Sequence, residues 1–163
     1  MYLKTLSVIT VTFLSLLFLV MTHFMPAATM LTATGPQDNA EIKCLAQAVY
    51  FEARGEPFSG QIAVAQVVHN RSTIRAKTYC DVVFEGSQHR NGCQFSFACD
   101  GKSDQAMEKV AWVQAVSVAD LVRSGKLRDI SGQATHYHAN YVSPGWSKRL
   151  IETATIGNHI FYR

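Results

Sequence analysis

Charged side chains are scarce in this 163-residue chain, and none lies between Lys4 and Asp38. They make up 17% of the residues against 48% for hydrophobic ones, and 15 Lys and Arg against 12 Asp and Glu give a net charge of +3. A run of basic residues interleaved with aromatics is also missing, so no nucleic-acid partner is expected. The length argues for one domain of ordinary size and against a multidomain protein.

The uncharged stretch has the pattern of a leader. Residues 6–21 form an apolar run behind Lys4, followed by Pro26-Ala27-Ala28 and then by small polar residues. This order is typical of a secretory signal peptide, although the apolar stretch is also long enough for a membrane anchor through residues 6–25. Both alternatives predict an exported protein of the periplasm or cell envelope. The chain is expected to divide into a signal peptide or anchor (1–28), a linker (29–38) and one functional domain (39–163).

Three kinds of motif are missing as well. There is no C-x2-C pair of zinc sites, no G-x-S-x-G of acyl-transfer enzymes and no glycine-rich phosphate loop. We therefore expect no metal and no cofactor. An even number of cysteines in an exported domain most simply forms two disulfides, with three pairings open. The candidates are Cys44, Cys80, Cys93 and Cys99.

Hydrophobic periodicity predicts three helices, at residues 39–54, 61–71 and 104–124. The first two should form a helical hairpin, and Asp38 with Glu41 resembles a capping box for the first. Ser103-Asp104 is expected to cap the third helix, which should be central because it is apolar around much of its circumference.

The remaining segments are predicted to contain strands. Alternating residues favour a small β-hairpin or an irregular lobe within 75–100, held by disulfides, and two short strands after Gly125. Helices followed by strands in this order indicate an α+β domain.

Glu52 is the most informative single residue. It follows Leu45 by seven positions and Val49 by three, which places its carboxylate on the apolar face of the first helix. Burial raises the pKa of a carboxyl, by as much as about 3 to 5 units when complete. A carboxyl protonated near neutral pH can act as general acid in glycosidic cleavage. The alternative is a structural glutamate paired with Arg54 or Arg71.

Glu56 is the candidate for a second carboxylate, four residues after Glu52. Gly55 and Pro57 interrupt the helix around it, so a role in capping the second helix is favoured. Glu56 and Arg54 are therefore assigned supporting roles.

Histidines and aromatics near the C-terminus allow two interpretations. His136 and His138 alternate, and with His159 they could form a three-histidine zinc site. An isolated H-x-H is a weak signal, and the neighbouring residues favour a sugar-binding wall instead. Those neighbours are Tyr137, Asn140, Tyr141 and Trp146.

Long sequence blocks across about residues 42–163 resemble the SleB/CwlJ family of cell wall hydrolases, named for enzymes that degrade spore-cortex peptidoglycan. The blocks are CLAQAVYFEARGEPFSGQIAVAQVVHNR, CDVVF, CQFSFACDG, ATHYHANYV, PGW and IGNHIFYR. The resemblance implies a lysozyme-like, lytic-transglycosylase-like fold, in which helices and a small β-lobe flank a glycan cleft. It also implies a single catalytic glutamate, the first of the EARGE block, which is Glu52. The matching QFS and HYH blocks imply substrate-binding roles for Gln94, Ser96, His136, Tyr137 and Tyr141.

The function expected from this resemblance is cleavage of the β-1,4 bond between N-acetylmuramic acid and N-acetylglucosamine in peptidoglycan strands, by a monomeric enzyme. Since no second carboxylate is well placed, a lytic transglycosylase route with an anhydro product is preferred over hydrolysis. The alternatives are a zinc-dependent amidase that uses the three histidines and a non-catalytic glycan-binding module.

Overall fold

The computed structural model describes residues 35–89 and 92–163. The expected leader (1–28) and most of the expected linker lie outside this part of the chain. Among the helices of the described residues, none combines the length and the apolar character needed to cross a membrane.

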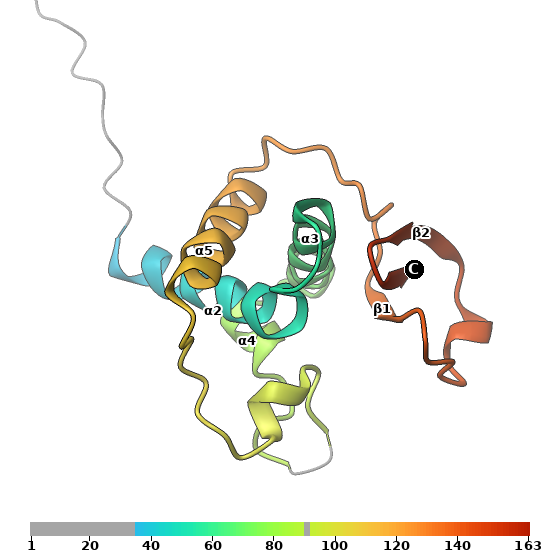
Figure 1. Cartoon of the computed structure of the whole chain (residues 1–163), viewed down its shortest axis with the longest axis horizontal. Coiled ribbons are helices and arrows are strands. Elements are labelled where there is room, and N and C mark those ends of the chain that lie inside the picture. Colours follow the sequence, from blue (N-terminus) through green and yellow to red (C-terminus); the bar gives the residue numbers. More distant parts are fainter. Residues whose placement is uncertain (1–34, 90–91) are drawn as a thin grey trace, which may run out of the picture. The chain divides into compact units, whose positions relative to one another are not determined.

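Helix α2 (Pro36–Ala53) lies at the centre of the helical part of the domain. Every residue from Cys44 to Tyr50 is buried, so all sides of this helix face other parts of the protein. The helices that pack against it are α3 (Phe58–Arg75), α4 (Tyr79–Val83) and α5 (Lys109–Arg123) (Figure 1). The predicted hairpin of two helices is confirmed, and both helices are longer than predicted.

The two side chains expected to cap α2 make contacts with other helices. Asp38 forms an ion pair with Arg123 at the end of α5, and the Glu41 carboxylate accepts a hydrogen bond from the Tyr79 N–H at 2.6 Å. The helix begins instead at Pro36. Proline suits this position, because an N–H in the first turn of a helix has no partner within the helix and its absence costs no hydrogen bond. The predicted capping box is therefore wrong, and the last three residues of the expected linker are helical.

Helix α5 covers α2 from one side and is not the central helix, contrary to the prediction. Val110 and Val113 on its outer face are 84% and 56% exposed. Its buried residues all lie on one face, namely Ala115, Val118, Ala119 and Val122. A count of apolar residues did not distinguish this helix from α2, whose small alanines allow neighbours to pack on every side.

The start of α5 is set by a side chain of α2. The Tyr50 hydroxyl accepts hydrogen bonds from the N–H groups of Met107 and Glu108, at 3.1 and 3.0 Å. These bonds satisfy N–H groups at the point where the helix begins, at Lys109. Ser103-Asp104 lies before this point and caps no helix, so that prediction is wrong.

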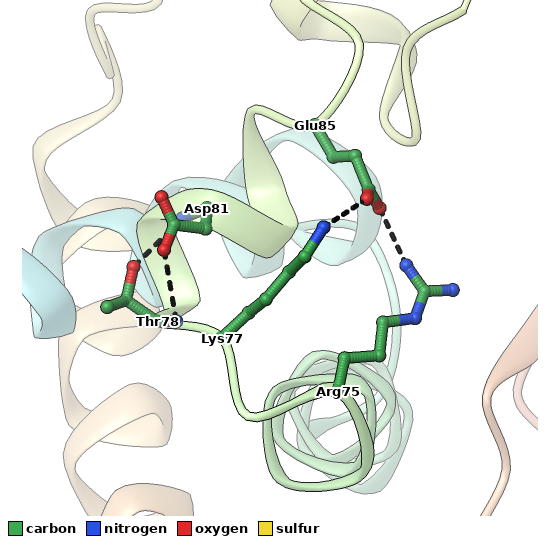
Figure 2. A network of polar contacts seen from close by, with 5 residues as sticks. All are labelled: Arg75, Lys77, Thr78, Asp81 and Glu85. Atoms are coloured by element: carbon green, nitrogen blue, oxygen red, sulfur yellow. Dashed lines mark hydrogen bonds and ion pairs between the residues drawn. The ribbon is translucent and has the colours of Figure 1, made fainter.

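Two sets of polar contacts hold the connection between α3 and α4 (Figure 2). Lys77 Nζ and Arg75 Nη1 both donate to the Glu85 carboxylate at 2.6 Å, and the Lys77 bond contributes most to lowering the pKa of Glu85. Thr78 and Asp81 form a capping box, in which each side chain accepts the other's N–H, at 3.0 and 3.3 Å. This capping box lies at the start of α4, within the segment where the sequence favours a hairpin or an irregular lobe.

The sheet lies in the C-terminal part of the chain. Its strands are antiparallel in the order β1-β3-β2, with bounds β1 (His136–Ala139), β2 (Glu152–Ile156) and β3 (His159–Tyr162). It packs on α3 through a small apolar cluster, whose members are Ala53, Ala63, Val64, Val67, Ala134 and Phe161. The tail thus contains three strands rather than two, and the α+β class is confirmed.

The β-hairpin considered for residues 75–100 is not formed, because the described part of this segment contains helix α4 and the 3-10 helix η1 (Ser96–Cys99) and no strand, which leaves the irregular lobe. Phe95 and Phe97 alternate in the sequence, but both point into the core from this short turn. The Phe97 ring stacks on Phe51 of α2 at 4.6 Å. Their spacing therefore reflects burial without strand pairing.

Two disulfides join the cysteines, as predicted. Cys44 of α2 is bonded to Cys80 of α4, and Cys93 is bonded to Cys99. The first bridge closes a long loop between two packed helices, with a sequence separation of 36, and the second closes a short loop with a separation of 6.

The two bridges should differ in what they contribute to stability. The chain-entropy relation gives about 4 kcal/mol for the long loop and about 2 kcal/mol for the short one. We expect the Cys44→Ala/Cys80→Ala variant to lose more unfolding free energy in urea titrations than the Cys93→Ala/Cys99→Ala variant. Equal losses would show that native contacts around the bridges, and not loop length, determine their effect.

Candidate active site

Glu52 lies in the last turn of α2, on the face that also carries Leu45 and Val49. Its side chain is half-buried, and its Oε2 accepts a hydrogen bond from the Tyr137 hydroxyl at 3.2 Å. Burial raises the pKa of the Glu52 carboxyl above its ordinary value of 4.5, and the Tyr137 bond and the charge of Arg71 oppose this rise. The carboxyl therefore keeps its proton to a higher pH than an exposed glutamate does.

Tyr137 reaches Glu52 from strand β1, on the face of the sheet that packs against the helices. Its ring lies 5.8 Å from Phe161, its partner in the register, and 5.1 Å from His159. Burial and the Glu52 charge raise the pKa of the Tyr137 hydroxyl well above 10.0. The hydroxyl therefore stays protonated and is available as a donor to an ionised Glu52.

Arg71 is buried on α3, with 6% of its surface exposed. Its Nε donates to the Thr135 carbonyl at 2.6 Å, and its guanidinium carbon lies 5.6 Å from the centre of the Phe95 ring. Burial lowers the pKa of Arg71, and the Glu85 and Glu52 charges oppose this change. Among the described residues Glu52 forms no ion pair, so the structural pairing considered from the sequence is not formed, and Arg71 influences Glu52 through space.

The entry into β1 is anchored to α3 by Asn70 and Asp129. Asn70 Nδ2 donates to the Asp129 carboxylate at 3.1 Å and to the Ala134 carbonyl at 3.0 Å, and Ser131 N–H donates to Asp129 at 2.7 Å. Burial raises the pKa of Asp129, but these hydrogen bonds outweigh it and lower the pKa overall. Because Tyr137 follows three residues after Ala134, these contacts orient it. Sequence reasoning did not identify them, since Asp129 lies in a loop without periodicity.

Glu56 anchors the other end of the sheet. Its carboxylate accepts hydrogen bonds from the backbone N–H and the side-chain amide of Asn158, at 2.8 and 3.2 Å. Gly157, before it in the β2–β3 turn, has φ +60, and a side chain there would collide with the Glu56 carboxylate. No side-chain cap is formed at the start of α3, so the expected capping role of Glu56 is wrong.

Arg54, also expected to support the site, points elsewhere. It follows Glu52 by two residues, which is about 200° around the helix. Its Nε donates to Glu108 at 3.0 Å, and its guanidinium lies 5.1 Å from the Tyr50 ring. Its contacts therefore stabilise the junction of α2 and α5.

The three histidines do not converge. His136 and His138 lie on the outer face of the sheet, with ring centres 5.4 and 5.6 Å from Trp146. His159 lies on the opposite face, because it pairs with Ala139 and packs against Tyr137. The residues that the structure describes contain no cluster of three metal-binding side chains. The zinc site considered as an alternative is incompatible with this register. The expected sugar-binding wall is divided too, because Tyr137 lies on the same face as His159 and Trp146 lies against His136 and His138.

The other expected substrate-binding residues have no described hydrogen bond to the Glu52 carboxyl. Gln94 and Ser96 are exposed on either side of buried Phe95. Tyr141 follows β1 and is 83% exposed. Of the five predicted substrate-binding side chains, Tyr137 is the one whose described contacts include the carboxyl of α2.

A model of the Cell Wall Hydrolase family matches residues 55–162, two thirds of the chain. The chain belongs to this family. The match begins just after Glu52, so it assigns no role to that residue.

Two cell wall hydrolase relatives illustrate the similarity in sequence. The chain is 36% identical over 132 residues to the spore cortex-lytic enzyme of Halalkalibacterium halodurans, covering 78% of this chain and 36% of the relative. It is 32% identical over 130 residues to the spore cortex-lytic enzyme of Bacillus subtilis, covering 78% and 39%. The chain thus spans less than half the length of these curated relatives.

Solved structures confirm the predicted lysozyme-like class. The catalytic domain of the Bacillus cereus SleB protein aligns with a TM-score of 0.58 at 29% identity, covering 77% of this chain and 91% of that one. The catalytic domain of the germination-specific lytic transglycosylase SleB from Bacillus anthracis aligns with the same TM-score at 27% identity, covering 85% and 100%.

The Glu52→Gln variant should be more stable than the wild type at neutral pH. Because burial raises the pKa of Glu52, the folded protein holds a proton that the unfolded chain has already lost, so the wild type loses stability as pH rises above 4.5. Gln keeps an acceptor for Tyr137 and carries no charge. The expected gain is about 1.4 kcal/mol for each unit by which the pKa is raised.

Urea titrations of both proteins across pH 4 to 8 measure this difference. The advantage of Glu52→Gln should be full above the folded-state pKa and vanish below the unfolded value of 4.5. A variant less stable than the wild type at neutral pH would mean that Glu52 is an ionised structural partner of Arg71.

Proposed function

We propose that this cell wall hydrolase is an exported peptidoglycan lytic transglycosylase with Glu52 as its catalytic acid and base. It would cleave the β-1,4 bond between N-acetylmuramic acid and N-acetylglucosamine. The observation that carries the proposal is the half-buried Glu52 carboxyl, whose pKa is raised and which accepts a hydrogen bond from Tyr137. The similarity to the catalytic domain of SleB from Bacillus anthracis, a germination-specific lytic transglycosylase, supports the reaction class.

In the proposed reaction, protonated Glu52 donates its proton to the glycosidic oxygen as the bond to the muramic C1 breaks. The Tyr137 hydroxyl then stabilises the resulting carboxylate. The carboxylate removes the proton of the muramic C6 hydroxyl, and the C6 oxygen bonds to C1, which gives a 1,6-anhydro product and restores protonated Glu52.

The position of Glu56 favours this route over hydrolysis. Activation of a water in a two-carboxylate glycosidase requires a second carboxylate near the scissile bond. The Glu56 carboxylate is already bonded to both donors of Asn158 and holds the β2–β3 turn. A reaction that uses the substrate's own C6 hydroxyl needs no second carboxylate.

The site and the sequence also support a cellular setting. Peptidoglycan lies outside the cytoplasm, and two disulfides are typical of exported domains. We propose that residues 1–28 direct export, that residues 6–25 can attach the protein to a membrane if they are retained, and that the domain at 39–163 acts as a periplasmic monomer. Gln94, Ser96, His136 and Tyr141 are proposed to contact the glycan.

Digestion of purified sacculi, followed by mass spectrometry, tests the reaction and the residue together. The wild type should release muropeptides with 1,6-anhydro ends, and Glu52→Gln should lose roughly 10² to 10⁴ in rate, as expected for loss of a general acid. The matched control is Glu108→Gln, which removes an exposed carboxylate paired with Arg54.

The control should digest sacculi at the wild-type rate. Reducing muramic ends without anhydro ends would reject the transglycosylase route, and an active Glu52→Gln would reject the residue. Intact strands that bind the protein without cleavage would instead identify a glycan-binding module.

Chelation separates the proposal from a zinc amidase. We expect the rate of sacculus digestion in EDTA to equal the rate without it, because the histidines lie on opposite faces of the sheet. Loss of activity in EDTA with recovery on added Zn²⁺, together with release of stem peptides, would contradict this.

A further inference from the structure

Arg71 is the buried charge that the proposed reaction leaves without a role. Its side chain is 6% exposed, its Nε donates to Thr135, and its Nη1 is buried with no hydrogen-bond partner among the described residues. A buried cation with an unsatisfied donor destabilises a fold. Its presence therefore calls for a compensating function.

Five titratable groups act on Arg71 or are acted on by it. They are Glu52 of α2, His136 and Tyr137 of β1, Glu85 of the segment after α4, and Arg75 of α3 itself.

Most of these groups cannot serve as a partner for the buried charge. Glu85 is held by Arg75 and Lys77. Tyr137 stays protonated, because burial raises its pKa, and burial with the nearby arginines lowers the pKa of His136 and keeps it neutral. Glu52 is the remaining acid, and it forms no ion pair among the described residues.

We infer that Arg71 is a positioning residue for proton transfer from Glu52. While Glu52 is protonated, the buried Arg71 has no ionised partner. When the proton reaches the glycosidic oxygen, the Glu52 carboxylate becomes that partner. This inference rests on the proposed function of Glu52. The Glu52 proton leaves with the glycosidic oxygen, and a second proton, taken from the muramic C6 hydroxyl, restores protonated Glu52.

The geometry fits such a role. Thr135, which fixes the guanidinium, and Tyr137, which binds Glu52, belong to one segment of chain, so both contacts depend on the same placement of β1. The guanidinium lies over the Phe95 ring, and the Arg71 side chain is buried. An interaction that strengthens only as charge develops on Glu52 accelerates the reaction without tightening substrate binding.

Two variants separate charge from packing. Arg71→Gln keeps a donor for Thr135 and removes the charge, whereas Arg71→Lys keeps the charge. We expect Arg71→Gln to lower kcat by roughly 10² to 10³ with KM little changed. It should also move the descending limb of the pH–rate profile to higher pH, because the Arg71 charge lowers the pKa of Glu52. Arg71→Lys should keep the limb at the wild-type pH.

The matched control is Arg75→Gln, which removes a cation from the next turn of α3, where it pairs with Glu85. It should leave kcat and the limb as in the wild type. Arg71→Gln with an unshifted limb, or the same shift in Arg71→Lys, would overturn the inference and reduce Arg71 to a packing role.

A measurement on the native sequence covers the case in which Arg71→Gln does not fold. The Arg71 guanidinium NMR signals should change with pH as Glu52 ionises, and they should stay constant in Glu52→Gln. Constant signals in both proteins overturn the role of Arg71 alone. An active Glu52→Gln overturns the proposed function itself.

Discussion

The hydrogen bond between the Tyr137 hydroxyl and the Glu52 carboxyl joins the sheet to helix α2. Tyr137 packs against both apolar clusters, the one around α2 and the one between α3 and the sheet. Strand β1 has four residues, and contacts outside the sheet ladder hold it as well. The geometry at Glu52 therefore depends on the anchors at both ends of the sheet, Asn70 with Asp129 and Glu56 with Asn158.

Features determined by local periodicity were predictable from the sequence. The facing of Glu52 follows from the 3.6-residue repeat of a helix, and the same repeat predicts the hairpin of α2 and α3. The number of disulfides follows from an even cysteine count, but the pairing depends on α2 and α4 lying side by side. The same-face rule that selects Glu52 also places Arg71 with Val64 and Val67, so its burial was accessible from the spacing.

Features that depend on contacts between distant segments were not predictable. The start of α5 is set by the Tyr50 hydroxyl, 57 residues away from the Met107 N–H that it binds. The separation of His159 from His136 follows from the pairing register, which the sequence of one strand does not contain. Phe95 and Phe97 alternate like strand residues, yet a short helical turn buries both. In each case a tertiary partner outweighed the local pattern.

Burial raises the pKa of Glu52, while the Tyr137 bond and the Arg71 charge lower it. These opposing influences suit a residue that acts first as acid and then as base in the proposed mechanism. On the proposed mechanism, burial alone would keep the carboxyl protonated. It would also destabilise the carboxylate that forms when the proton moves to the glycosidic oxygen, which would slow proton transfer. A direct ion pair with Arg71 would have the opposite effect, since an ionised Glu52 has no proton to donate. The described site avoids both extremes: the Tyr137 hydroxyl touches Glu52, while the Arg71 charge acts from a distance. On the proposed mechanism, Glu52 then alternates between acid and base within one catalytic cycle, and the reaction needs no second carboxylate.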